Sequence, residues 1–510
     1  METRSNRLHV TRIGKILPIV ACVFGFFAYM AMSQTFTYWG DELFTIFYAK
    51  KPLGEMLKQY FQQPDPGHPV GHYWVTNIWR KVMPESIAYD WWFNVLPIAC
   101  HFVVVGGIAM RGFSLLSQRL AFIGVCTVSS YFFMYAKQVR YYSFASLWVM
   151  VSLYAYYRWE KTGQWQYVVV GCVSGVVLLN SSYMGYLLFV TSVAGRLLMQ
   201  KRWPDWRQFS VGVGINLIGA IPVLALKSNQ FSTQLVQFDY SIVKQLIIRI
   251  LYLPYAAVVG EFLHPIGSLV AAVFVGALVV FVCRQATASA DDTVRFSMYC
   301  VGMLFFVTVF FTTFFYPYAI QSTPRFLMPM VYLFVYSLIK VRGPSYFIMG
   351  WLMINAVVLV CNVQKTWFIQ PILFIPHDEI VSQIRQQPSS TQCIISFVGS
   401  TTLISDHDAS FASPIQYLFL RHFPDRVASG IDHTRDYFLV HDMPLRVDNN
   451  RVLHQIQQEF PQHTMHATGF DNIPDINKSV LSQYWGLKAQ YKYYAIGLKA
   501  RQGDPAPVNQ

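Results

Sequence analysis

Long apolar runs recur along the first 363 residues of this 510-residue chain, and short polar segments separate them. Each run comes close to the ~20 residues that a helix needs to cross a lipid bilayer. The pattern therefore predicts eleven membrane-spanning helices. Their expected ranges are 13–33, 91–110, 120–135, 142–157, 165–180, 183–199, 208–226, 262–283, 296–316, 326–340 and 345–363.

The segment between the first two expected spans, residues 34–90, is long and has a pattern of its own. Apolar residues at helical spacing over 43–61 predict helices that lie in the membrane interface. The stretch 63–74 holds three prolines and two glycines. Proline removes a backbone donor and glycine favours turns, so this stretch predicts a non-helical turn, followed by an aromatic-rich helix.

From about residue 364 the pattern changes to short runs of two kinds. The runs 393–398, 437–440 and 493–498 are typical of strands, and 414–423 and 451–460 are typical of helices. They predict a small α/β domain over 364–501, followed by a disordered tail over 502–510. His463 and His466 lie three residues apart without a third ligand in view, which favours a solvated surface over a metal site.

Composition agrees with a membrane protein, because 54% of the residues are hydrophobic and only 13% are charged, against about 25% in an average soluble domain. The net charge of +13 gathers in alternate loops between the expected spans. The positive-inside rule then predicts a cytoplasmic N-terminus and places the C-terminal domain on the opposite side. The excess of positive charge is explained by the orientation of the chain in the membrane, and no nucleic-acid partner is expected. Seven of the eight cysteines lie in or beside spans, so no disulfide framework is implied.

Acidic residues are scarce in the membrane part, and those of the first loop stand out. Asp41 and Glu42 follow the first span closely, where a carboxylate is costly and tends to be retained for function. Asp41 could instead cap a helix beginning at Leu43. Asp65 and His68 lie three apart in the proline-rich turn and could face one cavity, or form only a turn.

Charged residues also mark three other ends of spans on the expected outward side. Arg140 lies in the sequence Lys-Gln-Val-Arg-Tyr-Tyr over 137–142, Glu261 and His264 begin the eighth span, and Arg325 begins the tenth. An arginine at such a place can extend towards lipid headgroups. It can equally hold a substrate phosphate through two parallel hydrogen bonds. The residues alone leave both interpretations open.

In this order the motifs resemble the GT-C integral-membrane glycosyltransferases. The nearest branches are family 39, the protein O-mannosyltransferases, and the aminoarabinose and galacturonosyl transferases that act on lipid A. The resemblance covers residues 10–340 and rests on the acidic pair after the first span, on Asp-Pro-Gly-His-Pro-Val-Gly-His-Tyr-Trp over 65–74, on Gln-Val-Arg-Tyr-Tyr over 138–142 and on Arg325-Phe326. Two positions depart from the family pattern, because Gln138 replaces a glutamate and Val70 replaces a second proline.

The resemblance implies a GT-C-like fold and an inverting transfer of a sugar. The implied donor is a polyprenyl-phosphate sugar in the membrane lipid, and the acceptor is an extracytoplasmic glycolipid, lipopolysaccharide, other envelope glycan or protein. Asp41 would be the general base with Glu42 beside it, and Arg140 and Arg325 would bind the donor phosphate. The residues expected to line the substrate pocket are Asp65, His68, His72, Tyr141, Glu261 and His264.

No cofactor is required by this chemistry, and a divalent metal ion at Asp65 and His68 stays open because two ligands are an incomplete set. The implied location is a bacterial inner membrane with the C-terminal domain in the periplasm.

Three other classes of function compete. A transporter or flippase would place charged residues deep within spans and often shows internal repeats. No repeat is evident in this sequence. His101 is the one titratable residue expected deep within a span, and a hydrogen bond to a neighbouring helix explains its presence. An O-antigen ligase or polymerase would depend on a large late loop, whereas the largest loop of the membrane part is the first. A non-catalytic membrane scaffold is the third alternative.

Overall fold

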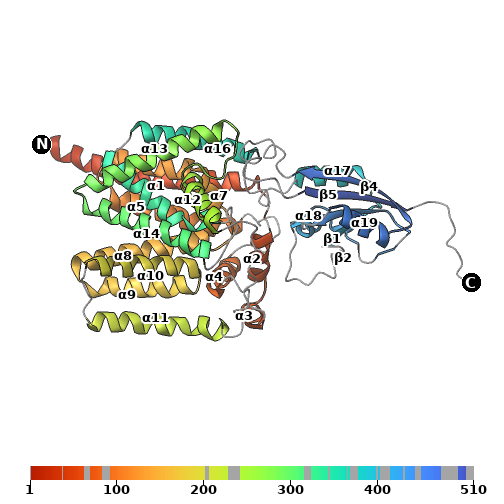
Figure 1. Cartoon of the computed structure of the whole chain (residues 1–510), viewed down its shortest axis with the longest axis horizontal. Helices are drawn as coiled ribbons and strands as arrows, with labels where there is room; N and C mark the ends of the chain where they lie inside the picture. The colour runs from red at the N-terminus through yellow and green to blue at the C-terminus, as the bar shows by residue number, and fades with distance from the viewer. Residues whose placement is uncertain are drawn as a thin grey trace, which may run out of the picture. The chain divides into compact units, whose positions relative to one another are not determined.

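The computed structural model of the chain is mostly helical and ends in a small sheet domain (Figure 1). It describes residues 2–36, 38, 40–62, 69–82, 92–200, 206–227, 242–314, 323–342, 345–364, 366–367, 377–397, 400–402, 414–428, 431–432, 434–442, 449–471 and 492–500.

Two compact units make up the chain, and each is described by itself. The first, called here the helical unit, comprises Met1–Thr35, Tyr48–Phe262 and Ile266–Val363. The second, called here the sheet unit, comprises Phe36–Phe47, Leu263–Pro265 and Gln364–Gln510.

Besides a short 3-10 turn over 92–94, sixteen α-helices and the 3-10 helix η3 are described up to residue 363. They are α1 (Glu2–Ser33), α2 (Gly40–Lys50), α3 (Leu53–Gln62), α4 (Val70–Lys81), α5 (Val95–Gly112), α6 (Leu116–Val128), α7 (Ser130–Ala136), α8 (Tyr142–Thr162), α9 (Trp165–Leu179), α10 (Tyr183–Gln200), α11 (Trp206–Lys227), α12 (Ile242–Val259), α13 (Gly267–Ala288), α14 (Asp292–Phe314), η3 (Pro324–Phe326), α15 (Met328–Arg342) and α16 (Tyr346–Val363).

Helices long and apolar enough to cross a membrane confirm a multi-pass membrane protein. Six of the described helices, α1, α5, α12, α13, α14 and α16, qualify by length and composition, and α6 with α7 would make a seventh span bent by 64°. Large apolar side chains on their outer faces are exposed, such as Phe24 at 73% and Val273 at 68%. Exposed apolar side chains along helices of this length are typical of contact with lipid. The expected number of eleven spans stays a prediction.

Helix α12 is absent from the expected spans, and the structure corrects this. Lys244, Arg249 and Pro254 interrupt its apolar run and hide the helix in the sequence. Arg249 is fully buried, and its guanidinium donates to the Gln245 side chain at 3.1 Å. A charged residue therefore does lie inside the helical unit, contrary to the expectation that only His101 would.

His101 itself behaves as expected of a core histidine. It is fully buried on α5, and its Nδ1 lies 2.6 Å from the hydroxyl of Tyr332 on α15. Its ring also stacks on Tyr29 of α1. The residue therefore joins three helices of the core.

The first loop forms three short helices, as its apolar spacing predicted. Pro52 separates α2 from α3, and α4 begins directly after Pro69. The side chain of Asn77 on α4 donates to the carbonyls of Ala49 and Lys51 at 2.9 and 2.7 Å. These carbonyls lie at the end of α2, where a helix leaves acceptors unsatisfied, so α4 holds the end of α2 in place.

The sheet unit has the predicted α/β architecture. Five strands lie in the order β2-β1-β3-β5-β4, with β1 and β3 parallel and the other neighbours antiparallel. They are β1 (Gln392–Phe397), β2 (Ser400–Thr402), β3 (Tyr437–Asp442), β4 (His463–Asp471) and β5 (Lys492–Ala500), and the helices are α17 (His377–Gln386), α18 (Pro414–His422), η6 (Pro424–Arg426) and α19 (Asn449–Glu459).

Two apolar clusters show how the helices of the sheet unit pack. One cluster joins α17 and α18 to side chains of β1 and β3, among them Ile384, Phe419 and Val440. The other joins α19 to alternate side chains of β3 and β5, among them Leu439 and Ile496. Because successive strand residues point to opposite faces, the two clusters cover opposite faces of the sheet. The tail over 502–510 lies outside the described residues.

The structure contradicts the expectation of a solvated His463. This residue is fully buried on β4, its Nε2 lies 2.9 Å from the Arg435 carbonyl, and its ring packs against Phe460. His466 is exposed. Positions three apart in a strand point to opposite faces, so the two histidines cannot share a ligand. Cys393 is also buried there, and burial raises the pKa of its thiol to about 12. All eight cysteines are free.

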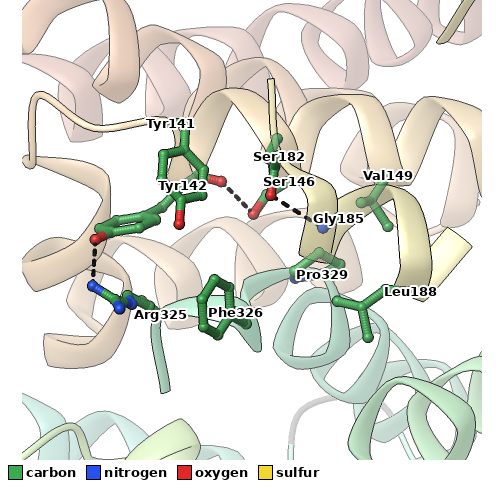
Figure 2. Close-up of a pocket in the computed structure, with 11 residues that line it drawn as sticks. Tyr141, Tyr142, Ser146, Val149, Ser182, Gly185, Leu188, Arg325, Phe326 and Pro329 are labelled. Atoms are coloured by element: carbon green, nitrogen blue, oxygen red, sulfur yellow. Dashed lines mark hydrogen bonds between the residues drawn. The ribbon is translucent and has the colours of Figure 1, made fainter. Parts of the chain in front are cut away.

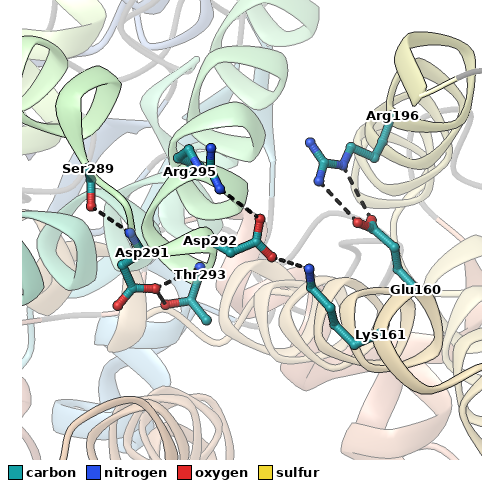
Figure 3. Close-up of polar contacts among 8 residues, drawn as sticks. All are labelled: Glu160, Lys161, Arg196, Ser289, Asp291, Asp292, Thr293 and Arg295. Carbon is teal, nitrogen blue, oxygen red and sulfur yellow. Dashed lines mark hydrogen bonds and ion pairs between the residues drawn. The ribbon is translucent and has the colours of Figure 1, made fainter.

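A cluster of charged residues ties four helices of the helical unit together at one end, and Figure 3 shows its members on α8, on α10 and around the start of α14. Glu160 on α8 pairs with Arg196 on α10 at 3.1 Å, and Lys161 on α8 pairs with Asp292 at the start of α14. Asp291 lies 3.9 Å from Lys340 near the end of α15. The cluster lies where α8 and α15 end, and the residues described next lie where they begin.

Candidate functional site

Two arginines singled out in the sequence lie beside two adjacent tyrosines. The guanidinium of Arg325 donates to the Tyr142 hydroxyl at 2.9 Å, and its carbon lies 5.6 Å from the centre of the Tyr142 ring (Figure 2). The Arg140 guanidinium lies 5.7 Å from the centre of the Tyr141 ring. The Tyr141 and Tyr142 rings are 4.8 Å apart, edge to face. The structure thus brings Arg140 and Arg325 to one pair of aromatic rings.

A small pocket opens beside Arg325 (Figure 2). It encloses about 260 Å³ of empty space, part of it open to the surroundings. Its lining is polar near Arg325 and becomes apolar along the helices, at Val149 and Leu188. The full lining is Tyr141, Tyr142, Ala145, Ser146, Val149, Ser182, Gly185, Leu188, Arg325, Phe326 and Pro329.

Three helix beginnings form the walls of this pocket. The lining residues belong to the first two turns of α8 and α10, with the residue before each helix, and to the η3–α15 segment. Backbone N–H groups point outwards at the start of a helix and give that end a partial positive charge. Together with the Arg325 side chain, this arrangement favours an anion such as a phosphate.

Helix α4 brings His72 against the Arg140 segment. Gly71 makes this approach, because its N–H donates to the Asn180 carbonyl at 2.7 Å and an added Cβ would lie 2.4 Å from that oxygen. The neighbouring His72 is buried, with its ring 6.3 Å from the Tyr141 ring. Burial, followed by the positive charge of Arg140, lowers the pKa of His72 to about 3. His72 is therefore neutral at physiological pH.

Glu261 lies next to the same group of tyrosines but not at the start of a span. It is buried in the segment between α12 and α13, which corrects the expectation that it begins the eighth span. The Tyr135 hydroxyl of α7 donates to its carboxylate. The Tyr135 ring lies 6.2 Å from the Tyr142 ring, so Glu261 is linked through two tyrosines to Arg325.

The acidic pair Asp41 and Glu42 belongs to the sheet unit, at the start of α2. Both carboxylates lie in the first turn of a helix that begins at Gly40, so Asp41 is not a cap before Leu43 as the alternative had it. Negative charge is stabilised at this end of a helix. Glu42 is buried and Asp41 is half-buried.

The remaining predicted residues divide into two groups. His264 lies in the sheet unit, with its ring 4.6 Å from that of Trp367, and it precedes α13 instead of beginning it. Asp65 and His68 lie outside the described residues. Among the residues that the structure describes, no group of three or more His, Cys, Asp or Glu side chains could hold a metal ion.

Three features of the site escaped the sequence prediction: the Tyr142 hydroxyl, the Ser182 side chain and the docking of Gly71. Ser182 lines the pocket, and its hydroxyl accepts from the Gly185 N–H at 3.1 Å. A serine directly before an apolar helix, as Ser182 is before α10, is a recognisable cap signal. Gly71 gives no such signal, because its role depends on a carbonyl 109 positions later in the sequence.

Comparisons with known proteins give two structural matches. No protein-family model matches the chain, and no curated protein does. The fold is similar to that of ArnT from Cupriavidus metallidurans in the apo state, with 12% sequence identity and a TM-score of 0.44. It is also similar to the same protein bound to undecaprenyl phosphate, with 13% identity and a TM-score of 0.41. Each comparison covers 94% of this chain and 97% of the matched chain. Similarity at this level carries no argument about the reaction.

Proposed function

We propose that this chain is a membrane glycosyltransferase that transfers a sugar from a polyprenyl-phosphate donor to an extracytoplasmic acceptor. The observation that carries the proposal is Arg325 in the lining of a pocket walled by three helix beginnings, with Arg140 behind it on the neighbouring tyrosine of that lining, Tyr141. This pocket is polar and cationic on one side and apolar on the other. A lipid phosphate has the same division between an anionic head and an apolar chain.

The arrangement suits a reaction whose leaving group is a phosphate. In such a transfer the acceptor hydroxyl oxygen forms a bond to the anomeric carbon while the bond from that carbon to the phosphate oxygen breaks. The leaving phosphate gains negative charge, and cations placed beforehand near it stabilise the transition state. Arg140 and Arg325 would serve this purpose, and no covalent intermediate is needed, so the anomeric configuration would invert.

The acceptor proton needs a base, and we assign Asp41 to this role by resemblance to the GT-C enzymes, with Glu42 beside it. A carboxylate is a common general base when it lies within hydrogen-bond reach of the acceptor hydroxyl. The neutral imidazole of His72 cannot provide a positive charge, so its contribution would be to pack and orient Arg140 and Tyr141. No step is assigned to a metal ion.

Donor binding tests the role of the arginines. Purified protein is assayed with a polyprenyl-phosphate sugar, and the donor KM is compared among Arg325→Ala, Arg140→Ala and the control Arg158→Ala. Arg158 lies near the far end of α8 and also packs on a tyrosine, 5.4 Å from the ring of Tyr167. Loss of a charge-assisted phosphate contact should raise the donor KM about 10- to 100-fold. Equal donor KM values in all three variants would refute the phosphate role.

The rate of sugar transfer tests the role of Asp41 as the base. Asp41→Asn keeps the size of the side chain but removes its basicity, so sugar transfer should fall by about 100-fold or more while donor binding persists. Unchanged transfer by folded Asp41→Asn protein would eliminate Asp41 as the base. A flippase would move the lipid-linked sugar without releasing free polyprenyl phosphate, and a ligase or polymerase would require a lipid-linked glycan chain as donor. Release of free polyprenyl phosphate from the monosaccharide donor separates the three activities.

A further inference from the structure

The bend between α6 and α7 is held by two buried asparagines of α16. The backbone N–H of Ser130 donates to Oδ1 of Asn355 at 3.0 Å, and Nδ2 of Asn362 donates to the Ser130 hydroxyl at 2.5 Å. The amide of Asn355 also donates to the carbonyl of Val258, near the end of α12, at 2.8 Å. Asn355 therefore fixes the beginning of α7 and the end of α12 at the same time.

The two asparagines lie on the inner face of a helix whose other face is apolar and exposed. Trp351, Asn355 and Asn362 are fully buried, whereas Met353 and Val357 are 67% and 60% exposed. An amide in a membrane-spanning helix is costly unless its groups are bonded. Asn355 bonds α7, α12 and the Trp351 carbonyl of its own helix, whereas Asn362 bonds α7 through Nδ2 alone, so Asn355 is the residue of the two that joins three helices.

Two tyrosines extend this anchor from α7 towards the arginine pocket. The Tyr131 hydroxyl donates at 2.7 Å to the carbonyl of Pro324, the residue before Arg325. Tyr135, one helical turn later, donates to Glu261. Helix α7 thus holds the two segments that carry Arg325 and Glu261.

A glycine allows the second of these segments to approach. Gly260 has a φ of +85°, and an added Cβ would lie 2.7 Å from the Ser130 hydroxyl and 3.3 Å from the Tyr131 backbone nitrogen. The turn that carries Glu261 is therefore packed directly on the beginning of α7. Asn355 holds both partners of this contact, Ser130 and the end of α12.

We propose that Asn355 is a positioning residue for Arg325, acting through α7 and the Tyr131 hydroxyl without contact to the substrate. When the Asn355 amide is lost, α7 can shift at its first turn, and the η3 segment that carries Arg325 loses its fixed position. The consequence for catalysis rests on the function proposed above, whereas the mechanical link between Asn355 and η3 does not.

Hydrogen exchange of the full chain in detergent micelles tests the link directly. In Asn355→Leu, backbone amides of 130–136 and of 323–327 should exchange about 3- to 20-fold faster, the range expected from loss of one hydrogen bond between membrane helices. The control is Asn216→Leu on α11, where the lost amide bonds its own helix at Gly212 and the Tyr186 hydroxyl. Faster exchange of 130–136 with unchanged exchange of 323–327 would overturn the proposal.

A kinetic measurement separates this proposal from the proposed function. Asn355→Leu should raise the donor KM by the same ~3- to 20-fold, with a much smaller change in kcat. Adding Tyr131→Phe should raise the donor KM little further, because both substitutions break the same chain of contacts from Asn355 through α7 to η3. Additive effects would show that the residues act independently and would refute the path. If Asn355→Leu speeds hydrogen exchange as expected but the protein has no donor-dependent activity, the proposed sugar transfer is contradicted and the link between Asn355 and η3 stands. If Asn355→Leu does not fold, Asn362→Ala, which removes only the bond to the Ser130 hydroxyl, replaces it under the same criteria.

Discussion

The docking of α4 at Gly71 gives the sharpest prediction of stability. In Gly71→Ala the new methyl group would lie 2.4 Å from the Asn180 carbonyl oxygen and 3.1 Å from the Ser181 hydroxyl. The first contact is with backbone, which cannot rotate away as a flexible side chain can. Helix α4 must therefore move back from the turn between α9 and α10, and the Gly71 N–H must give up its 2.7 Å hydrogen bond.

The magnitude follows from three contributions. Overpacking typically lowers the free energy of unfolding by about 1–3 kcal/mol, and a lost hydrogen bond lowers it by about 0.5–1.5 kcal/mol. Alanine in place of glycine inside a helix raises it by about 1 kcal/mol. The net expectation is a loss of about 1–3 kcal/mol in the free energy of unfolding. The control is Gly54→Ala on α3, where an added Cβ meets nothing within 4 Å, and this variant should be stabilised by up to ~1 kcal/mol.

Denaturant unfolding in mixed micelles, followed by tryptophan fluorescence, measures both variants under one condition. The two alanine substitutions should shift the unfolding midpoint in opposite directions. The Gly71 variant should also raise the donor KM, because the adjacent His72 packs against Tyr141 and lies near Arg140. A Gly71→Ala midpoint equal to or above that of Gly54→Ala would show that α4 does not dock at this turn.

Three further predictions concern single side chains. Tyr142→Phe removes the hydroxyl that accepts from Arg325, so the donor KM should rise about 3- to 10-fold in steady-state assays while the unfolding midpoint changes little; an unchanged KM would count against that contact. The pKa of His72 is about 3 in the folded chain and 6.5 in the unfolded chain, so the unfolded state binds more protons between these pH values. The free energy of unfolding should therefore fall by up to ~1.4 kcal/mol per pH unit as the pH drops below 6.5. His72→Asn should flatten that pH dependence, and an equal slope in parent and variant would contradict it. Glu160→Gln breaks a half-buried ion pair and should cost about 1–3 kcal/mol in unfolding experiments, against less than ~1 kcal/mol for Lys161→Met in the exposed pair beside it; equal losses would show that burial does not set the strength of these pairs.

Much of the fold could be predicted because its pattern is local. Apolar runs of the length of a bilayer, strand-like runs after residue 364 and the broken helices of the first loop all follow from neighbouring residues in the chain. Helix α12 could not be recognised in this way, because Arg249 points into the protein and its cost is met by partners that sequence spacing does not show. His463 was misjudged for a related reason, since its burial depends on β4 pairing with β5.

The candidate site was predictable in its residue types but not in its connections. Arg140 and Arg325 are isolated charges at the ends of expected spans, which indicated a binding role, and the structure places them on adjacent tyrosines. The contacts that hold them come from distant parts of the sequence, such as Asn355 on α16 and Gly71 on α4. Hydrogen bonds between helices carry no periodic signal, so they remain invisible until the helices are packed.

The charged cluster at the ends of α8 and α15 gives the two ends of these helices different resistance to separation. Ion pairs join α8 to α10 and α14, and α15 to the start of α14, at one end. At the other end the Tyr142–Arg325 hydrogen bond joins α8 to the turn before α15. Salt weakens exposed ion pairs, and the Lys161–Asp292 and Lys340–Asp291 pairs are at least partly exposed. Raising the ionic strength should therefore loosen the charged end of these helices more than the end held by the Tyr142–Arg325 hydrogen bond.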